Sequence, residues 1–247
     1  MNVVCVFKWA RDPEDAWVNP DGSVTWRGAK FKASDDDAAA IVFARQLAQE
    51  TDGTLVGVTI GSGDTTWAAA RGAQRIVCIP DVGPSPDDMA TAAALAAAVR
   101  CAGDVDVVVI GDALNHPGVS GTLGALLGMP VLAGVDDVVL DPADPGRVLA
   151  SRRAGSDVET LAGTPPLLVA VAAKAAEKEI PAVKDLMADR KRPIDTVDAE
   201  QAGAPSQDTV AIVGSRAPET HTARIFGGDT ATAARDLVAE LRKEGVL

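Results

Sequence analysis

The chain contains no tyrosine, 3% aromatic residues, three cysteines and two histidines in a length of 247 residues. With so few aromatic side chains, the core must be aliphatic and rich in alanine. Hydrophobic residues make up 47% of the sequence, which is enough for one large α/β domain with or without an arm. Cys5, Cys78 and Cys101 lack metal-ligand spacing, so we interpret them as buried reduced thiols. His116 and His221 also lie at no metal-binding spacing, and no metal site is predicted.

Positive charge is also scarce, because the formal net charge is −12. This balance is unfavourable for binding nucleic acid and for a polybasic membrane-surface patch. Segment 166–173, among the most apolar, is far shorter than the ~20 residues of a membrane-spanning helix. The first residues, MNVVCVFKWARD, enter a strand without a signal-peptide pattern. We therefore expect a cytoplasmic protein without membrane insertion.

Several nucleotide and catalytic motifs are missing. No GxxxxGK[ST] segment occurs, and Lys8 and Trp9 stand where a dinucleotide-binding GxGxxG would follow the first strand. The glycine-rich IGSGDTTW follows a later strand instead. Carboxylates cluster at 12–15 and 34–37, but helix amino termini and solvated loops explain them. We identify no nucleophile–base pair, so we predict no catalytic residues and no self-sufficient enzyme.

Strand-like and helical segments alternate through the first two thirds of the chain. Several strands are continuously apolar, which is typical of strands covered on both faces. Ser34 and Ser85 are predicted to cap the helices that follow them, and 65–71 predicts a short helix. The alternation predicts an α/β fold with a doubly wound, mostly parallel sheet. The predicted strands are 3–7, 54–60, 76–79, 105–110 and 167–172.

The pattern changes after about Val131. DDVVLDPADPGRVLASRRAGSDVETLAG predicts an antiparallel excursion with turns at its Pro/Gly segment and at 155–157. We predict a core at 1–197, followed by a linker and arm at 198–247. The arm ends in an amphipathic helix with Leu237, Val238 and Leu241 on one side, and we expect this helix to dock on a partner subunit.

The segment VVVIGDALNHPGVSGTLGALLG, 107–128, is the strongest candidate for a ligand site. A β-branched strand ends at Gly111, a Gly/Asn/Ser/Pro loop follows, and a small-residue helix is predicted from about Gly121. Parallel sheets bring anions to such turns, because backbone N–H groups and the positive helix end point toward the ligand. A plain structural turn is the alternative.

Three collinear blocks resemble the β subunit of electron-transfer flavoproteins over nearly the whole chain. The first is VVCVFKWARDPED, the second is RRAGSDVETLAGTPPLLVAV, and the third pairs DLMADRKRPI with DLVAELRKEGVL. IGSGDTTWAAARGAQRIVCI is similar to the family's strand, turn and helix. The resemblance implies an adenine-nucleotide-binding, Rossmann-like domain paired with an α-like subunit that holds FAD. It further implies AMP or a second FAD in this chain, and electron transfer from a dehydrogenase to the respiratory chain or another acceptor.

The resemblance also implies a nucleotide site at the strand ends. The first strand would face the adenine, the 34–37 turn would read the base or ribose, and the 111–122 loop would wrap ribose and phosphate. The implied residues are Val6, Ser34, Asp35, Asp36, Asp37, Ile60, Gly61, Gly111, Asp112, Asn115, His116, Gly118, Val119, Ser120, Gly121 and Thr122.

The chain departs from the family pattern in several places. Its 111–122 loop lacks the consecutive aspartates and Asn-Gln-Thr-Gly of the family, and Ser-Asp-Asp-Asp at 34–37 adds negative charge beside any phosphate. In the dehydrogenase-docking segment, Ala172–Glu179, Ala175 replaces an anchoring leucine. Loss of a buried apolar anchor predicts a different or weaker dehydrogenase partner.

Two other function classes stay open at this stage. PGVSGTLGALLG is a partial match to the phosphate loop of a homodimeric, universal-stress-type adenine-nucleotide sensor. An adenylating enzyme would need a glycine-rich loop after the first strand, which WARDPED does not supply.

Overall fold

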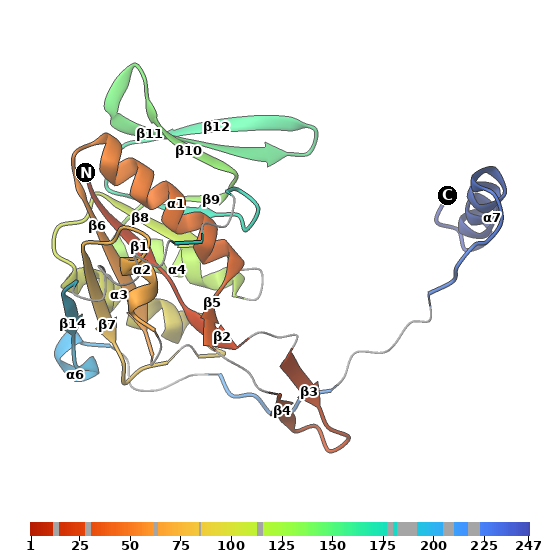
Figure 1. Ribbon diagram of the computed structural model, residues 1–247, viewed down its shortest axis with the longest axis horizontal. Coiled ribbons are helices and arrows are strands. Elements are labelled where there is room, and N and C mark those ends of the chain that lie inside the picture. Colours follow the sequence, from red (N-terminus) through yellow and green to blue (C-terminus); the bar gives the residue numbers. More distant parts are fainter. Residues whose placement is uncertain are drawn as a thin grey trace. The chain divides into compact units, whose positions relative to one another are not determined.

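The computed structural model describes the whole chain except residues 12–14, 28–30, 62–63, 84, 113–115, 177–179, 182–191, 205–209 and 217–222. Its body is an α/β domain around a seven-stranded sheet (Figure 1). The elements are β1 Asn2–Val6, β2 Trp9–Arg11, β3 Ala16–Val18, β4 Val24–Trp26, β5 Phe31–Ala33, α1 Asp35–Glu50, β6 Thr54–Ile60, α2 Thr66–Ala69, β7 Arg75–Ile79, α3 Asp88–Cys101, β8 Val107–Gly111, α4 Pro117–Leu127, β9 Val131–Val135, β10 Asp137–Asp141, β11 Asp144–Ala154, β12 Asp157–Gly163, β13 Leu167–Val171, β14 Ile194–Thr196, α6 Ala199–Ala202 and α7 Thr230–Lys243.

The central sheet has the strand order β14-β7-β6-β1-β8-β13-β9. Every pairing within it is parallel. From β1 the chain passes outward to β6 and β7, and then returns to place β8 on the other side of β1. This order confirms the doubly wound parallel sheet and puts its topological switch point between β1 and β8.

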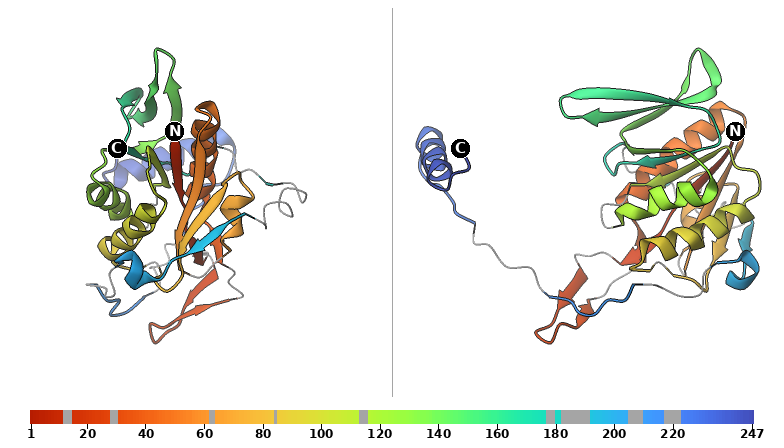
Figure 2. Two further views of the ribbon diagram at one scale, coloured as in Figure 1. Left: turned by 90° about the vertical axis from the view of Figure 1, so that its left-hand side faces the viewer. Right: turned by 180° about the vertical axis from the view of Figure 1, so that it is seen from behind.

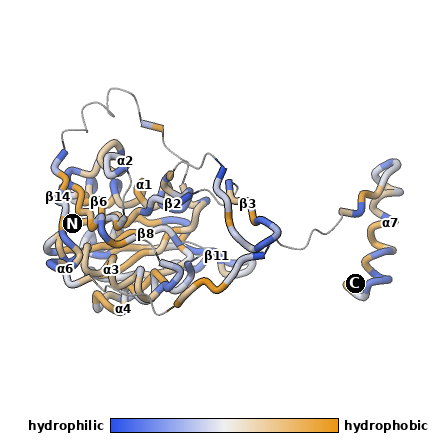
Figure 3. Tube along the Cα trace, turned by 90° about the horizontal axis from the view of Figure 1, so that it is seen from below, coloured by the Kyte–Doolittle hydropathy of each residue, from blue (hydrophilic) through white to orange (hydrophobic). Residues whose placement is uncertain are grey.

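Each face of the sheet buries its own apolar cluster. Helices α1 and α2 cover one face, and α3 and α4 cover the other (Figure 2). Alternate residues of one strand serve the two faces, since Cys5 packs under α1 whereas Val4 and Val6 pack under α3 and α4. Continuous apolar strands such as β8 are therefore needed, because a parallel strand in this position meets protein on both sides. The strand β8 is coloured as an apolar segment along the trace (Figure 3).

The cysteines in the described body are free, and Cys5 and Cys78 are buried. Burial, followed by the nearby charge of Asp37, raises the pKa of the Cys5 thiol well above its ordinary value. The predicted buried reduced thiols are confirmed for these two positions.

Helix α1 begins as the sequence predicts. Ser34 is the N-cap, and with Asp37 it forms a capping box in which each side chain bonds the other residue's backbone. Asp35, Asp36 and Asp37 fill the first turn, where negative charge stabilises the positive end of the helix.

Two predicted helix starts are wrong. Asp87, not Ser85, is the N-cap of α3, and its carboxylate accepts from the N–H groups of Met89 and Ala90. Ser85 instead accepts from the N–H of Asp87. Helix α4 begins at Pro117 rather than near Gly121, because proline lacks the N–H that the first turn leaves unbonded and its fixed φ suits this position.

The region after Val131 contains two strands that the sequence did not predict. Val131–Val135 is β9, a parallel edge strand of the central sheet beside β13. The excursion itself is confirmed as the three-stranded antiparallel sheet β10-β11-β12. A further strand, β14, pairs with β7 at the opposite edge; sequence reasoning missed it because three residues carry no readable periodicity.

The chain divides into two compact units. One comprises Met1–Trp17 and Thr25–Val213, and the other comprises Val18–Val24 and Gly214–Leu247. Within the second unit, α7 is capped by Asp229 and has no buried residue. Its apolar Leu237 and Val238 are 44% and 38% exposed, and hydrophobic and hydrophilic segments alternate along its trace (Figure 3). None of the helices in the described part of the chain is both long and apolar enough to cross a membrane.

Candidate functional site

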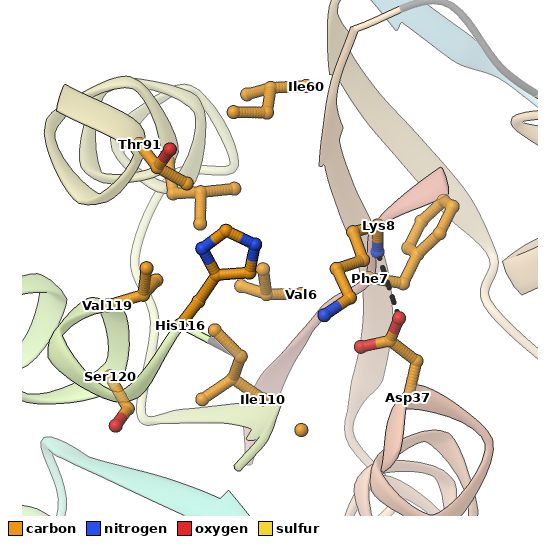
Figure 4. A pocket seen from close by; sticks show the side chains of 12 residues that line it. Val6, Phe7, Lys8, Asp37, Ile60, Thr91, Ile110, His116, Val119 and Ser120 are labelled. Atoms are coloured by element: carbon orange, nitrogen blue, oxygen red, sulfur yellow. Dashed lines mark hydrogen bonds between the residues drawn. The ribbon is translucent and has the colours of Figure 1, made fainter. Parts of the chain in front are cut away.

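A pocket opens at the carboxyl ends of β1, β6 and β8, at the switch point of the sheet. It encloses about 570 Å3, part of which is open to solvent. This location matches that of small-molecule sites in α/β proteins. The lining residues are Val6, Phe7, Lys8, Asp37, Ile60, Thr91, Leu95, Ile110, Gly111, His116, Val119 and Ser120 (Figure 4).

Most of the pocket wall is apolar. Val6, Ile60, Ile110 and Val119 come from three strands and from α4, and all four are buried. Thr91 adds little polarity, because its hydroxyl already accepts from the N–H of Ser85 and donates to the Ser85 carbonyl. Such a wall fits the face of a flat ring, with orientation left to a few polar groups.

One polar side of the pocket is built by α1 and the end of β1. Asp37 Oδ2 accepts from the Lys8 N–H at 3.1 Å and from the Ser34 hydroxyl at 2.7 Å. Asp37 is only 3% exposed, and burial is the main cause that raises its pKa to about 6. The bonds from Ser34 and Lys8 oppose this rise without cancelling it. In Figure 4 the Lys8 side chain extends into the pocket beside this carboxyl.

The opposite polar side is built by α3 and α4. His116 is the residue before Pro117, and its Nδ1 is hydrogen-bonded to Asp88 Oδ1 at 3.0 Å. The other carboxylate oxygen of Asp88 accepts from the Gly118 N–H at 2.9 Å. The imidazole ring therefore lies across the pocket, with its second nitrogen on the side of Lys8 (Figure 4).

The floor of the pocket depends on a close approach between α1 and β8. A Cβ atom at Gly111 would lie 2.8 Å from the Asp36 Cβ and 2.9 Å from the Asp36 carbonyl carbon. Only glycine therefore allows the first turn of α1 to reach the end of β8. Asp36 Oδ2 is buried at this contact without a hydrogen-bond partner.

The electron transfer flavoprotein domain model matches residues 23–202. The chain belongs to the electron transfer flavoprotein family. The match covers most of the chain and includes β6, β7, β8, β13, α1, α3 and α4, the elements that carry most of the pocket. The resemblance noted in the sequence is thereby confirmed, and flavin-based electron transfer is the function class of this domain.

The flavoprotein fold brings together about half of the residues predicted for a nucleotide site. Val6, Asp37, Ile60, Gly111, His116, Val119 and Ser120 all line the pocket. Asp36 packs behind Gly111, and Gly118 contacts Asp88. Ser34 supports Asp37 through the capping box, whereas Asp35 is exposed.

Among the described residues, the remaining predicted ones do not line the pocket. The Asp112 carboxylate accepts from the Gly134 N–H and so points toward β9. Gly61 has φ +80° and donates its N–H to the Ile79 carbonyl, so it shapes the turn after β6. Gly121 and Thr122 lie inside α4. Asn115 lies outside the described residues.

Sequence reasoning missed five lining residues and one supporting residue. Phe7 and Lys8 directly follow Val6, and Ile110 directly precedes Gly111, so extending each strand end by a residue would have found them. Thr91 and Leu95, one turn apart on α3, and Asp88 carry no local signal. Their helix belongs to the site only because it covers the sheet face beside β1.

The predicted dehydrogenase-docking segment is described as far as Ala176. Lys174 is exposed, whereas Ala175 and Ala176 pack against the chain's own core. Residues 177–179 of this segment lie outside the described part of the chain.

Proposed function

We propose that this electron transfer flavoprotein chain is a β-type subunit. It pairs with an α-type subunit that binds FAD, and the pair accepts electrons from a dehydrogenase and passes them to the respiratory chain or another acceptor. The switch-point pocket is the observation that supports this proposal, since parallel α/β sheets bind nucleotides at this position.

The pocket is proposed to hold the adenine nucleotide of AMP or of a second FAD. The apolar residues of β1, β6, β8 and α4 fit a planar ring, and Lys8, Asp37, His116 and Ser120 provide the polar contacts. The first FAD is proposed to bind mainly on the α-type subunit and to supply the one- and two-electron chemistry. In this division of roles, the present chain binds, orients and shields, and is not itself an enzyme.

Two surfaces are proposed to contact other proteins. The exposed apolar face of α7, at Leu237 and Val238, is a candidate contact for the α-type subunit. Segment 172–179, with Lys174 exposed, is a candidate contact for the dehydrogenase. A homodimeric nucleotide sensor of the universal-stress type remains the alternative, but it gives the α7 arm no role.

The test is co-expression of the full chain with an α-type chain from the same genome, followed by denaturing release and mass spectrometry of bound small molecules. We expect a yellow heterodimer that contains one FAD and a second nucleotide. The variant Val119→Phe should lose the second nucleotide, because the larger side chain fills the pocket. Leu126→Phe is the control, because Leu126 lies on the same helix and is 41% exposed. Self-dimers that bind ATP and no flavin in any combination would overturn the proposal.

The proposed α7 contact is tested separately by size-exclusion chromatography. We expect Leu237→Asp combined with Val238→Asp to abolish co-elution with the α-type chain, whereas Arg235→Asp leaves it intact. Co-elution that survives the double substitution would remove α7 from the interface.

A further inference from the structure

We propose that Asp88 and His116 make the switch-point pocket selective for the uncharged ring portion of its ligand and keep phosphate away from the amino end of α4. This inference rests on the proposed function, in which the pocket binds a nucleotide. It goes further by stating which chemical part of that ligand the pocket accepts.

The first three residues of α4 offer no free amide to an anion. Pro117 has no N–H, and the Gly118 N–H donates to Asp88 Oδ2 at 2.9 Å. The Val119 N–H makes a long bond of 3.2 Å to the His116 carbonyl. A phosphate bound here would use these same donors, so the chain's own carboxylate occupies the position of the anion.

The position of Asp88 is built into the local backbone. A Cβ at residue 118 would lie 2.9 Å from Asp88 Oδ2 and 3.2 Å from Asp88 Cβ. Glycine at 118 therefore makes room for the carboxylate, which reaches α4 from the first turn of α3. A substitution at 118 offers a second way to displace the carboxylate without altering Asp88.

The same carboxylate fixes the direction of His116. Asp88 Oδ1 lies 3.0 Å from Nδ1, so the proton of the neutral tautomer belongs on Nδ1, and in that tautomer Nε2 is an acceptor. Nε2 points to the Lys8 side of the pocket (Figure 4). The pair thus offers the ligand an acceptor, which suits an amine or hydroxyl and gives nothing to a phosphate oxygen.

The charges around the pocket favour the same ligand. Among the described residues that line the pocket, Lys8 is the only lysine or arginine, and its side chain extends into the space beside Asp37 (Figure 4). Asp37 stands on one side of the space and Asp88 stands behind His116 on the other. One ammonium group thus faces two carboxyl groups, and this balance of charge is unfavourable to a doubly charged phosphate. A flat neutral ring is accommodated against the apolar wall.

The experiment compares two ligand pairs that differ only by a phosphate: adenosine with AMP, and riboflavin with FMN. Binding to the full-length chain is measured by calorimetry at about pH 8, where free imidazole is neutral. The variants are Asp88→Asn and Gly118→Ala, and thermal unfolding confirms that each is folded. Asp104→Asn is the control, because it removes one carboxylate from an exposed position at the opposite end of the sheet.

We expect the wild type to bind at least one nucleoside no more weakly than its phosphate ester. Asp88→Asn should tighten binding of that ester about tenfold and change nucleoside binding less than about threefold. Gly118→Ala should shift the same ratio in the same direction, and Asp104→Asn should leave it unchanged. The pair that binds tells whether the ring is adenine or flavin.

Three results would overturn the inference. If AMP or FMN binds the wild type tenfold more tightly than its nucleoside, the selectivity is wrong but the proposed nucleotide site is supported. If Asp88→Asn leaves the ratio unchanged, Asp88 does not exclude phosphate. If none of the four ligands binds, both the selectivity and the nucleotide site are wrong. The FAD content of the heterodimer then tests the rest of the proposed function.

Discussion

Helices α1 and α4 both begin at the carboxyl edge of the sheet, and both place a carboxylate at their amino end. In α1 the carboxylate is Asp37, which lies in the helix's own first turn and bonds to Ser34, its N-cap. In α4 the carboxylate is Asp88, which comes from α3 and reaches Gly118 across 30 positions of sequence. The carboxylate at α1 comes from a neighbouring residue in the sequence, whereas the carboxylate at α4 is brought there by tertiary packing.

The difference concerns how firmly each carboxylate is held and how strongly it is buried. Asp37 accepts three hydrogen bonds through one oxygen and is almost fully buried. The Asp88 side chain is 28% exposed and divides its two oxygens between Gly118 and His116. We infer that the α1 side is a fixed wall of the site and that the α4 side sets what the site accepts.

The largest expected effect comes from the charge of Asp37. Its pKa is about 6 in the folded protein against an ordinary 3.8, so the folded state holds a proton that the unfolded state has lost. The stability due to this proton is fully present below about pH 4 and is lost as the pH rises through about 6. Asp37→Asn removes this dependence. We therefore expect its free energy of unfolding, relative to that of the wild type, to rise by about 3 kcal/mol between pH 4 and pH 7.

Urea unfolding at a series of pH values measures this difference. Comparison with the variant cancels the titration of the other carboxylates, and asparagine still accepts the bond from Lys8. A difference that stays constant from pH 4 to pH 7 would show that the Asp37 carboxyl is charged throughout, and the contrast with Asp88 would disappear.

The next effect tests the contact that brings α1 to the floor of the pocket. Gly111→Ala forces a methyl group against the Asp36 Cβ and backbone, and overpacking of this kind costs about 2 kcal/mol. Urea unfolding at neutral pH should show this loss of stability.

Gly121→Ala is the matched substitution at the other helix, since a Cβ there meets nothing within 4 Å. In the middle of a helix it should stabilise the protein by about 0.5–1 kcal/mol. Equal effects at the two glycines would mean that α1 is not held by close packing at β8.

A smaller effect than that of Gly111→Ala separates the two helix caps directly. Ser34→Ala removes the cap hydroxyl and should lower the free energy of unfolding by about 1 kcal/mol. Asp88→Ala should cost a similar amount by unpairing the Gly118 N–H. Amide hydrogen exchange distinguishes them: the first variant should speed exchange in the first turn of α1, and the second should speed exchange of Gly118. If Asp88→Ala leaves the Gly118 amide unchanged, α4 does not depend on α3 for its cap.

Much of the fold was predictable because its signals are local. Several of the five predicted strands are continuously apolar and indicated a sheet covered on both faces, and Ser34 marked the start of α1. The start of α3 was misplaced because Ser85, Asp87 and Asp88 are all acceptable caps by residue type, and only the backbone conformation selects Asp87. The edge strand β9 was missed because its place in the sheet comes from pairing with β13, a partner distant in sequence.

The candidate site was predictable only where it follows the strand ends. Val6, Ile60 and Gly111 could be found because parallel strands end at one edge of the sheet. Thr91, Leu95 and Asp88 could not, because a residue's place on a covering helix says nothing about which pocket that helix overhangs.

The amino-acid sequence by itself determined the parallel α/β core, the α1 cap and the membership of a flavin-linked electron-transfer family. These follow from apolar periodicity, from residue types a few positions apart, and from motifs kept in order along the chain. The tertiary structure alone decided that Asp88 occupies the amino end of α4 and turns His116 into the pocket. That outcome depends on how closely α3 and α4 pack at Gly118, and such distances are set by the whole core rather than by any local stretch of residues.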